Sequence, residues 1–303
     1  NQSYATNIKE TGQTFIPMLA SFVAVGTNAI LDYLMIFGIG PFPELNVTGA
    51  AIATVLAQAI VTLMFVCFAM KDSLIFQDIH IFKKPKADYI RSIIHIGLPT
   101  SIQNMLFTGI SMILARFVAS YGDAAIAVQK VGSQIESISW MTADGFAAAV
   151  NSFIAQNHGA GNKVRIRKGY TCAMGVVLIW GVICTLLLML CPAPIFRIFI
   201  TEPEILPMGI DYLVILGVSQ LFMSVEITTA GAFSGYGKTL TPSVNSIVFT
   251  ALRIPLALLL IRTDLGLNGI WWSITISSIV KGIVIFTLFF IFLRKERITY
   301  VDK

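Results

Sequence analysis

Four carboxylate residues stand inside long apolar stretches of the sequence, where an ionised group is costly. They are Asp32, Glu136, Asp144 and Glu226. Insertion scales put the cost of a charge at the centre of a membrane helix at about 2.5–3.5 kcal/mol, so such residues are candidates for function. Because removal from water disfavours the charged form, a carboxylate in this setting can exchange a proton or bind a small cation.

Asp32 has two neighbours that carry oxygen ligands. Asn28 precedes it by one helical turn on the same face, and Thr54 lies on the next apolar stretch. A carboxylate, an amide oxygen and a hydroxyl suit Na⁺ or a shared proton. These three residues are therefore a candidate cation site, with Asp32 as the ligand of any bound Na⁺. The alternative is that Asp32 only hydrogen-bonds a neighbouring helix.

Glu136 and Glu226 have aromatic and methionine neighbours at helical spacing. Trp140 shares a face with Glu136, and Phe222 and Met223 share one with Glu226. Such a setting suits a flat, apolar organic cation, because the rings offer cation–π attraction and methionine repacks around varied shapes. We predict that these five residues contribute to a cation site and a substrate cavity.

Two basic residues within the apolar stretches leave another interpretation open. Arg253 and Lys281 could form permanent salt bridges with Glu136 or Glu226 instead. We place Arg253 in the cavity, since a charge in mid-span needs an acidic or carbonyl partner. The other expected cavity residues follow Pro99 in the sequence: Gln103, Asn104 and Phe107.

The composition excludes most classes of soluble protein. Of 303 residues, 56% are hydrophobic and only 12% are charged, with a mean hydropathy of +0.80, whereas soluble domains carry about 25% charged residues. A globule of this size cannot hide so many apolar side chains. The chain is therefore predicted to be an integral membrane protein in a lipid bilayer, with no nucleic-acid partner. Its four cysteines lack a CxxC spacing and predict no metal or redox role.

The apolar stretches predict an all-α fold with eight transmembrane helices, each needing about 20 apolar residues. The predicted spans are roughly 15–39, 47–70, 93–119, 122–155, 168–191, 205–235, 241–262 and 266–293.

The basic residues alternate between the loops that join these spans. One set of loops and ends holds 15 Lys and Arg residues, and the opposite set holds only Arg197 and Arg262. Because cytoplasmic loops are enriched in Lys and Arg, both chain ends are predicted to be cytoplasmic. The charged stretch 72–91 is expected to be an amphipathic cytoplasmic connector.

An internal repeat suggests two similar bundles. The segment ETGQTFIPM at 10–18 matches GYGKTLTPS at 235–243 in its Gly, Thr and Pro, at an offset of 225 residues. Chance similarity of two turns is the alternative. A repeat of this size would place the start of the first bundle roughly 130 residues before Asn1. We therefore expect residues 1–71 to be the last two helices of a first lobe and residues 92–303 to be a complete six-helix lobe, as in transporters with parallel repeats.

An ordered set of motifs resembles the multidrug and toxic compound extrusion (MATE) transporters, over essentially the whole chain. The matching segments are ETGQTFIPM (10–18), NAILDYLMIFG (28–38), GAAIAT (49–54), IGLPTSIQN (96–104), QNHGAGN (156–162), GAFSGYGKT (231–239) and RIPLALLL (253–260).

The resemblance implies a twelve-helix, two-lobed antiporter that exports organic cations and drugs by alternating access, driven by H⁺ or Na⁺. It gives Asn28, Asp32 and Thr54 the role of the first lobe's cation site, to which a helix outside this chain would add an acidic ligand. Some relatives carry a glutamate in the first helix of the second lobe. This sequence has no carboxylate between Pro99 and Arg116, so an acidic role there falls to Glu136 or Glu226.

The resemblance also implies a bacterial inner (plasma) membrane location, and we expect a monomer with no cofactor beyond the coupling ion. No enzyme is predicted, because the spans lack a catalytic Ser/His, a paired-Asp motif or HExxH. The alternative function is a flippase for lipid-linked oligosaccharides, which shares this fold. A flippase would favour a strongly basic cavity, whereas four acids accompany Arg253 and Lys281 here. That balance favours cationic cargo.

Overall fold

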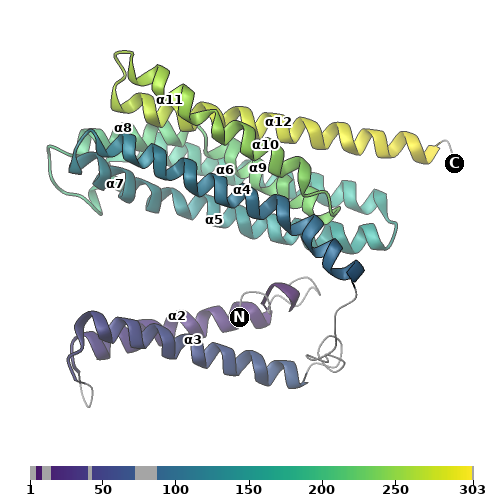
Figure 1. Ribbon diagram of the computed structural model, residues 1–303, viewed down its shortest axis with the longest axis horizontal. Helices are drawn as coiled ribbons and strands as arrows, with labels where there is room; N and C mark the ends of the chain where they lie inside the picture. Colours follow the sequence, from purple (N-terminus) through teal and green to yellow (C-terminus); the bar gives the residue numbers. More distant parts are fainter. Residues whose placement is uncertain (1–4, 9–14, 40–42, 72–86, 302–303) are drawn as a thin grey trace. The chain divides into compact units, whose positions relative to one another are not determined.

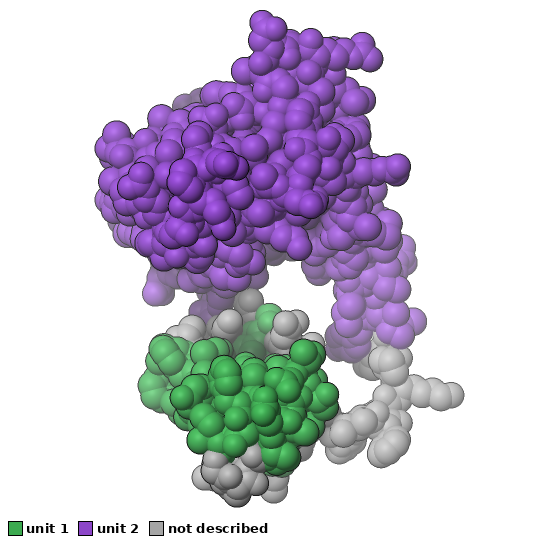
Figure 2. Space-filling model, turned by 90° about the vertical axis from the view of Figure 1, so that its left-hand side faces the viewer, with its two compact units in different colours: residues 1–85 green, residues 86–303 purple. Residues whose placement is uncertain are grey.

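The computed structural model describes residues 5–8, 15–39, 43–71 and 87–301, and these residues form helices joined by turns. The chain separates into two compact units, residues 1–85 and 86–303, which Figure 2 distinguishes by colour. Each unit has its own hydrophobic clusters. The units are therefore described one at a time.

Unit 1 is a helical hairpin of α2 (Phe15–Ile36) and α3 (Asn46–Lys71), which pack along each other (Figure 1). Leu45 donates its backbone N–H to the Met35 carbonyl at 3.0 Å. At Gly49 the two helices approach so closely that a Cβ would lie 2.6 Å from the Met35 carbonyl oxygen. Glycine is therefore required for this hairpin to close.

Unit 2 is a bundle in which α9 is central, since it packs against α5, α6 and α12. Its interior includes a cluster of aromatic rings in tilted and edge-to-face contact, with Phe289 lying 4.5 Å from Tyr170 and 4.9 Å from Phe233 between centroids. The helices of this unit are α4 (Ala87–Ala119), α5 (Asp123–Gly159), α6 (Lys163–Leu190), α7 (Pro192–Arg197), α8 (Leu206–Gly217), α9 (Gln220–Gly235), α10 (Leu240–Ala251), α11 (Arg253–Ile261) and α12 (Leu267–Val301).

Two predicted spans are broken in the middle. The helix expected over 205–235 divides into α8 and α9, with a bend of 46°, where Ser219 Oγ donates to the Leu216 carbonyl at 2.8 Å. The helix expected over 241–262 divides into α10 and α11 at Leu252. Pro255 follows this break. Proline has no backbone N–H to donate to the carbonyl of the preceding turn, and its ring clashes with that carbonyl. The second break places Arg253 at the first position of α11.

Three glycines bring the backbones of unit 2 into contact. A Cβ at Gly231 would lie 2.5 Å from the Ala147 carbonyl oxygen of α5, and one at Gly282 would lie 2.5 Å from the Phe222 carbonyl oxygen of α9. A Cβ at Gly235 would also be too close to α5. Close approach at small residues is a common way to pack helices in membranes, where dispersion rather than exclusion of water holds them together.

Each of the eight predicted spans coincides with a helix or a broken helix. Six of the described segments are long and apolar enough to cross a membrane, and α8 with α9 would make a seventh. The helix α5, which carries Glu136 and Asp144, is not among them, so the count of eight stays a prediction. The protein is nevertheless an all-α, multi-pass membrane protein.

The predicted connector, residues 72–91, lies mostly outside the described residues. Its last five residues are helical, because α4 begins at Ala87 rather than near residue 93. Asp88 in the first turn favours this early start, since a negative charge stabilises a helix N-terminus.

Candidate functional site

Glu136 of α5 is buried inside unit 2, with 8% of its surface exposed. The Gln220 side chain of α9 donates through Nε2 to Glu136 Oε2 at 3.2 Å, and Tyr212 of α8 is a second polar neighbour. The other carboxylate oxygen, Oε1, has no hydrogen-bond partner among the described residues. No described Lys or Arg forms a direct ion pair with Glu136, although Arg253 interacts with its charge from a greater distance.

Glu226 of α9 is held differently. Its Oε1 lies 3.0 Å from Nζ of Lys281 on α12, and both side chains are buried. The Lys281 backbone carbonyl in turn accepts a hydrogen bond from Asn245 Nδ2 at 3.2 Å. The salt bridge left open as an alternative by the sequence is thus present at Glu226, with Lys281 as the partner. In this structure Lys281 therefore neutralises the charge of Glu226.

Arg253 of α11 is also buried, with 7% of its surface exposed. Its Nε donates to Ser277 Oγ at 2.8 Å and its Nη2 donates to Ser278 Oγ at 3.0 Å, both on α12. It interacts through charge with both Glu226 and Glu136, although no described carboxylate pairs directly with its guanidinium. Two hydroxyls therefore fix the position of this cation.

The interior of unit 2 thus contains two acids and two bases from four helices. Glu136 and Glu226 balance Arg253 and Lys281 when all four are ionised. Protonation of one carboxylate would leave the cluster with a net positive charge, and a bound cation would need one carboxylate to be free. Of the two, Glu136 is the carboxylate without a direct basic partner.

The expected cavity residues are distributed over several helices. Arg253 is brought near Phe107 of α4, with its Cζ 6.0 Å from the ring centroid. Asn104 and Trp140 are exposed. The half-buried members of the predicted set are Gln103, Phe222 and Met223. Apart from the contact between Arg253 and Phe107, no hydrogen bond, ion pair or ring contact joins these described residues to one another, so the cavity stays a prediction.

In unit 1 the structure brings two of the three predicted ligands together. Asn28 Nδ2 donates to Thr54 Oγ1 at 3.4 Å, and the Thr54 hydroxyl donates to the Ala50 carbonyl at 2.9 Å. Asp32 lies one turn from Asn28, and its Oδ1 is buried without a hydrogen-bond partner among the described residues.

Sequence reasoning missed the neutral partners of the buried charges. Gln220, Ser277 and Ser278 were assigned no role, although each donates to or accepts from a charged side chain. A Ser pair or a lone Gln within an apolar helix was the available signal. Polar side chains in such helices are frequently satisfied by other helices.

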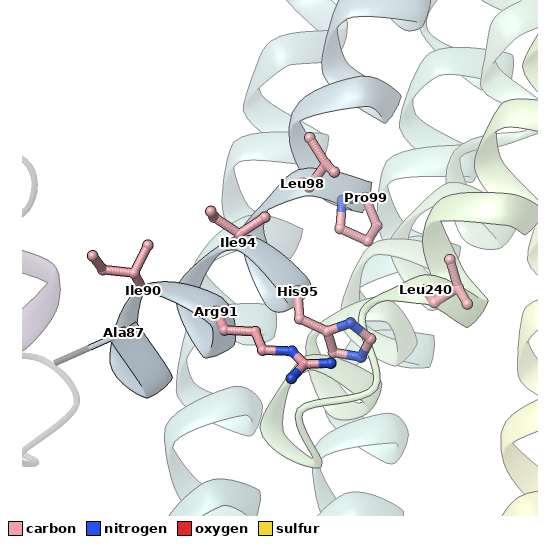
Figure 3. Close-up of a pocket in the computed structure, with 8 residues that line it drawn as sticks. All are labelled: Ala87, Ile90, Arg91, Ile94, His95, Leu98, Pro99 and Leu240. Atoms are coloured by element: carbon pink, nitrogen blue, oxygen red, sulfur yellow. The ribbon is translucent and has the colours of Figure 1, made fainter.

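A separate hollow of about 510 Å³ lies where α4 and α10 begin. Its lining in Figure 3 combines Arg91 and His95 from the first turns of α4 with Pro99 and with Leu240 of α10. None of the expected cavity residues lines it. Nearby, Thr239 Oγ1 donates to the Ile96 carbonyl at 2.8 Å and ties the start of α10 to α4.

The fold and the buried charges together define a class: a polytopic helical membrane protein that keeps ionisable groups in its interior. The MatE family model matches residues 99–259. This match covers more than half of the chain, and the chain belongs to the MatE family.

Curated relatives agree with this membership. The chain is 31% identical over 297 residues to the probable multidrug resistance protein NorM of Thermotoga maritima, covering 95% of the chain and 62% of that protein. It is 26% identical to the FAD transporter of Shewanella oneidensis, covering 93% and 62%. It is also 26% identical to the multidrug export protein MepA of Staphylococcus aureus, covering 95% and 62%. The chain thus spans about three fifths of their length.

Among solved structures, the fold is similar to a crystal structure of MATE in the bent conformation. The TM-score is 0.83 at 23% sequence identity, covering 95% of this chain and 64% of that chain. This likeness supports the helical architecture.

Proposed function

We propose that the chain is part of an antiporter that exports organic cations and drugs by alternating access, in exchange for H⁺ or Na⁺. Membership of the MatE family and similarity to the multidrug proteins NorM and MepA support export. Coupling of export to an ion is supported by one observation: Glu136 is a buried carboxylate with one oxygen that lacks a hydrogen-bond partner, and it has no direct basic partner among the described residues.

Glu136 is the group that we assign to ion exchange in the second lobe. A carboxylate that is buried without a counter-ion is stabilised by taking up a proton or a cation. If the two transport conformations differ in how well they solvate Glu136, the ion binds them with different affinity. That difference in affinity is what couples an ion gradient to the conformational change.

Glu226 takes a second role in this proposal. Because Lys281 neutralises it at 3.0 Å, Glu226 can bind an incoming cation only after Lys281 moves away. We therefore retain Glu226 as a cation-binding residue of a rearranged state. In the state described here it joins α9 to α12.

Asn28, Asp32 and Thr54 form the proposed cation site of the first lobe. With Asn28 Nδ2 turned toward Thr54, the Asn28 carbonyl oxygen and the unpartnered Asp32 Oδ1 remain as acceptors. Two such oxygens can hold a proton between them or contribute to a Na⁺ shell. An additional carboxylate from the upstream part of the transporter would complete the set.

The proposed setting is the plasma membrane of a bacterium, with both ends of the chain in the cytoplasm and one transporter molecule as the working unit. The 15 basic residues on one set of loops, against two on the other, support this orientation. No catalytic activity is proposed.

Export of an anion is the second candidate function, because a relative is named an FAD transporter and Arg253 is a buried cation without a direct carboxylate partner. A lipid-linked oligosaccharide flippase would need the same kind of basic cavity. Both are disfavoured by the two carboxylates that accompany Arg253 and Lys281.

Transport by the full-length protein in proteoliposomes tests the proposal. Na⁺ and H⁺ gradients are imposed separately, with a fluorescent organic cation and FAD as alternative cargoes. We expect one gradient to drive movement of the cation, and the variants Glu136→Gln and Asp32→Asn to lose this coupling. Gradient-driven movement of FAD but not of the organic cation would replace the first candidate by the second.

A further inference from the structure

A groove of about 400 Å³ runs between α6 and α12 on unit 2. Its walls are apolar along most of their length, with Met174 and Leu178 from α6 and Phe286 and Phe290 from α12. A Cβ built at Gly175 would meet no atom within 4 Å, so the middle of the groove is open space. The groove is thus elongated and mostly apolar.

One end of this groove is positively charged. Arg167 of α6 and Arg294 of α12 both line it, and none of its lining residues is acidic. The Arg294 guanidinium lies 4.6 Å from the centroid of the Phe290 ring, which holds the cation over the groove. Neither arginine forms an ion pair with a described carboxylate. An adjoining hollow shares Arg167 and adds Lys168.

The length of the groove matches one leaflet of a bilayer. From Arg167 to Leu178 the helix advances 11 residues, or about 16 Å at 1.5 Å per residue. The hydrocarbon core of a bilayer is about 30 Å thick, so one leaflet is about 15 Å deep. The charged end therefore lies at head-group level when the apolar part spans one leaflet.

We propose that this groove binds an anionic phospholipid. The phosphate lies between Arg167 and Arg294, and one acyl chain follows the apolar walls past Gly175. Arginine suits this role because its guanidinium donates two parallel hydrogen bonds to phosphate oxygens, and basic pockets between membrane helices on the cytoplasmic side recognise anionic head groups. The proposal is independent of the transported substrate.

Lipid binding by the full-length transporter in detergent tests this site through native mass spectrometry. Phosphatidylglycerol and phosphatidylcholine with identical acyl chains are titrated separately. We expect tighter binding of phosphatidylglycerol, and a loss of about thirtyfold in that affinity for Arg167→Ala/Arg294→Ala, as expected for two cations near a phosphate. The double variant Arg167→Gln/Arg294→Gln serves if the alanine variant does not purify.

The matched control removes two arginines outside the groove. The double variant Arg165→Ala/Arg262→Ala removes the same amount of charge. The Cζ of Arg165 lies 5.8 Å from the centroid of the Phe153 ring, and Arg262 lies at the C-terminal end of α11. The affinity of this double variant for phosphatidylglycerol should be unchanged. An equal loss in this control would show that net charge alone attracts the lipid, and the proposal would be wrong.

The apolar part is tested by filling it. Gly175→Leu should weaken binding of phosphatidylglycerol although both arginines remain, while Val176→Phe, at the neighbouring position outside the groove, should not. If Gly175→Leu binds the lipid as the parent does, no acyl chain occupies the groove. If glycerophosphoglycerol, which is the head group without chains, binds as tightly as the phospholipid, the site is one for soluble phosphates. Either result overturns the proposal.

Discussion

Lys281 Nζ lies 3.0 Å from Glu226 Oε1 in the interior of the second unit, and this ion pair links α12 to α9. The pairing has a direct consequence for mutagenesis at Glu226. A loss of transport on changing Glu226 has two causes to separate, because removal of one partner leaves the other charge buried and unpaired.

Glu226→Gln should therefore destabilise the folded transporter by about 3–5 kcal/mol. The double variant Glu226→Gln/Lys281→Met removes both charges and should recover most of that loss. Thermal unfolding in detergent, followed by size-exclusion chromatography, measures both. Equal destabilisation of the single and double variants would show that the pair contributes little.

Glu136→Gln is the contrasting substitution in the same unit. Glu136 has no direct basic partner, and glutamine keeps its shape while removing the buried charge. We expect the free energy of unfolding to change by no more than about 1 kcal/mol, together with a loss of ion-coupled transport. A melting temperature that falls as far as that of Glu226→Gln would mean that Glu136 has a hidden counter-charge.

Arg253→Lys should be destabilising although the charge is retained. The guanidinium donates to Ser277 and Ser278 through two different nitrogens, and an ammonium group cannot reproduce that fork. The expected cost is about 1.5–3 kcal/mol, the usual worth of a hydrogen bond to a charged group. Arg262→Lys, at an exposed position, is the control and should be neutral. Thermal unfolding of the two variants decides between these outcomes.

Gly231→Ala should destabilise the second unit by about 1–3 kcal/mol through overpacking, because the new Cβ would meet the Ala147 carbonyl oxygen. Gly145→Ala on α5 is the matched control. Its Cβ would meet nothing within 4 Å, and alanine is the better helix former by about 1 kcal/mol. Opposite shifts in melting temperature are expected, and a neutral Gly231→Ala would show that α5 and α9 can separate at low cost.

The helices were predictable because an apolar stretch of 20 or more residues has few alternatives in a membrane. The breaks were not. The segment around Ser219 contains no proline. Gly217 and Ser219 are a weaker sign of a kink, because small residues also occur in straight, closely packed membrane helices. Pro255 was visible, but its effect depends on whether neighbouring helices satisfy the freed carbonyl.

The candidate site was predictable in its charges and not in its pairing. Glu136, Glu226, Arg253 and Lys281 were identified because ionisable residues are rare in apolar helices. Which acid meets which base depends on helix rotation and tilt, and periodicity does not fix either. The prediction of a cation site at Asn28, Asp32 and Thr54 rests on spacing within one helix and on an order of motifs. The structure brings Asn28 and Thr54 into contact, and the role of the three residues stays a prediction.

The glycine contacts have a mechanical consequence. Gly231 and Gly235 hold α9 against the α5 backbone, and Gly282 holds α12 against α9, with no side chain between the main chains at any of these three points. Interdigitated side chains can slide past one another by changing rotamer, whereas abutting backbones have no such slack. When the transporter changes conformation, α5, α9 and α12 are expected to move together as one rigid group. The change in conformation must then take place at other helices.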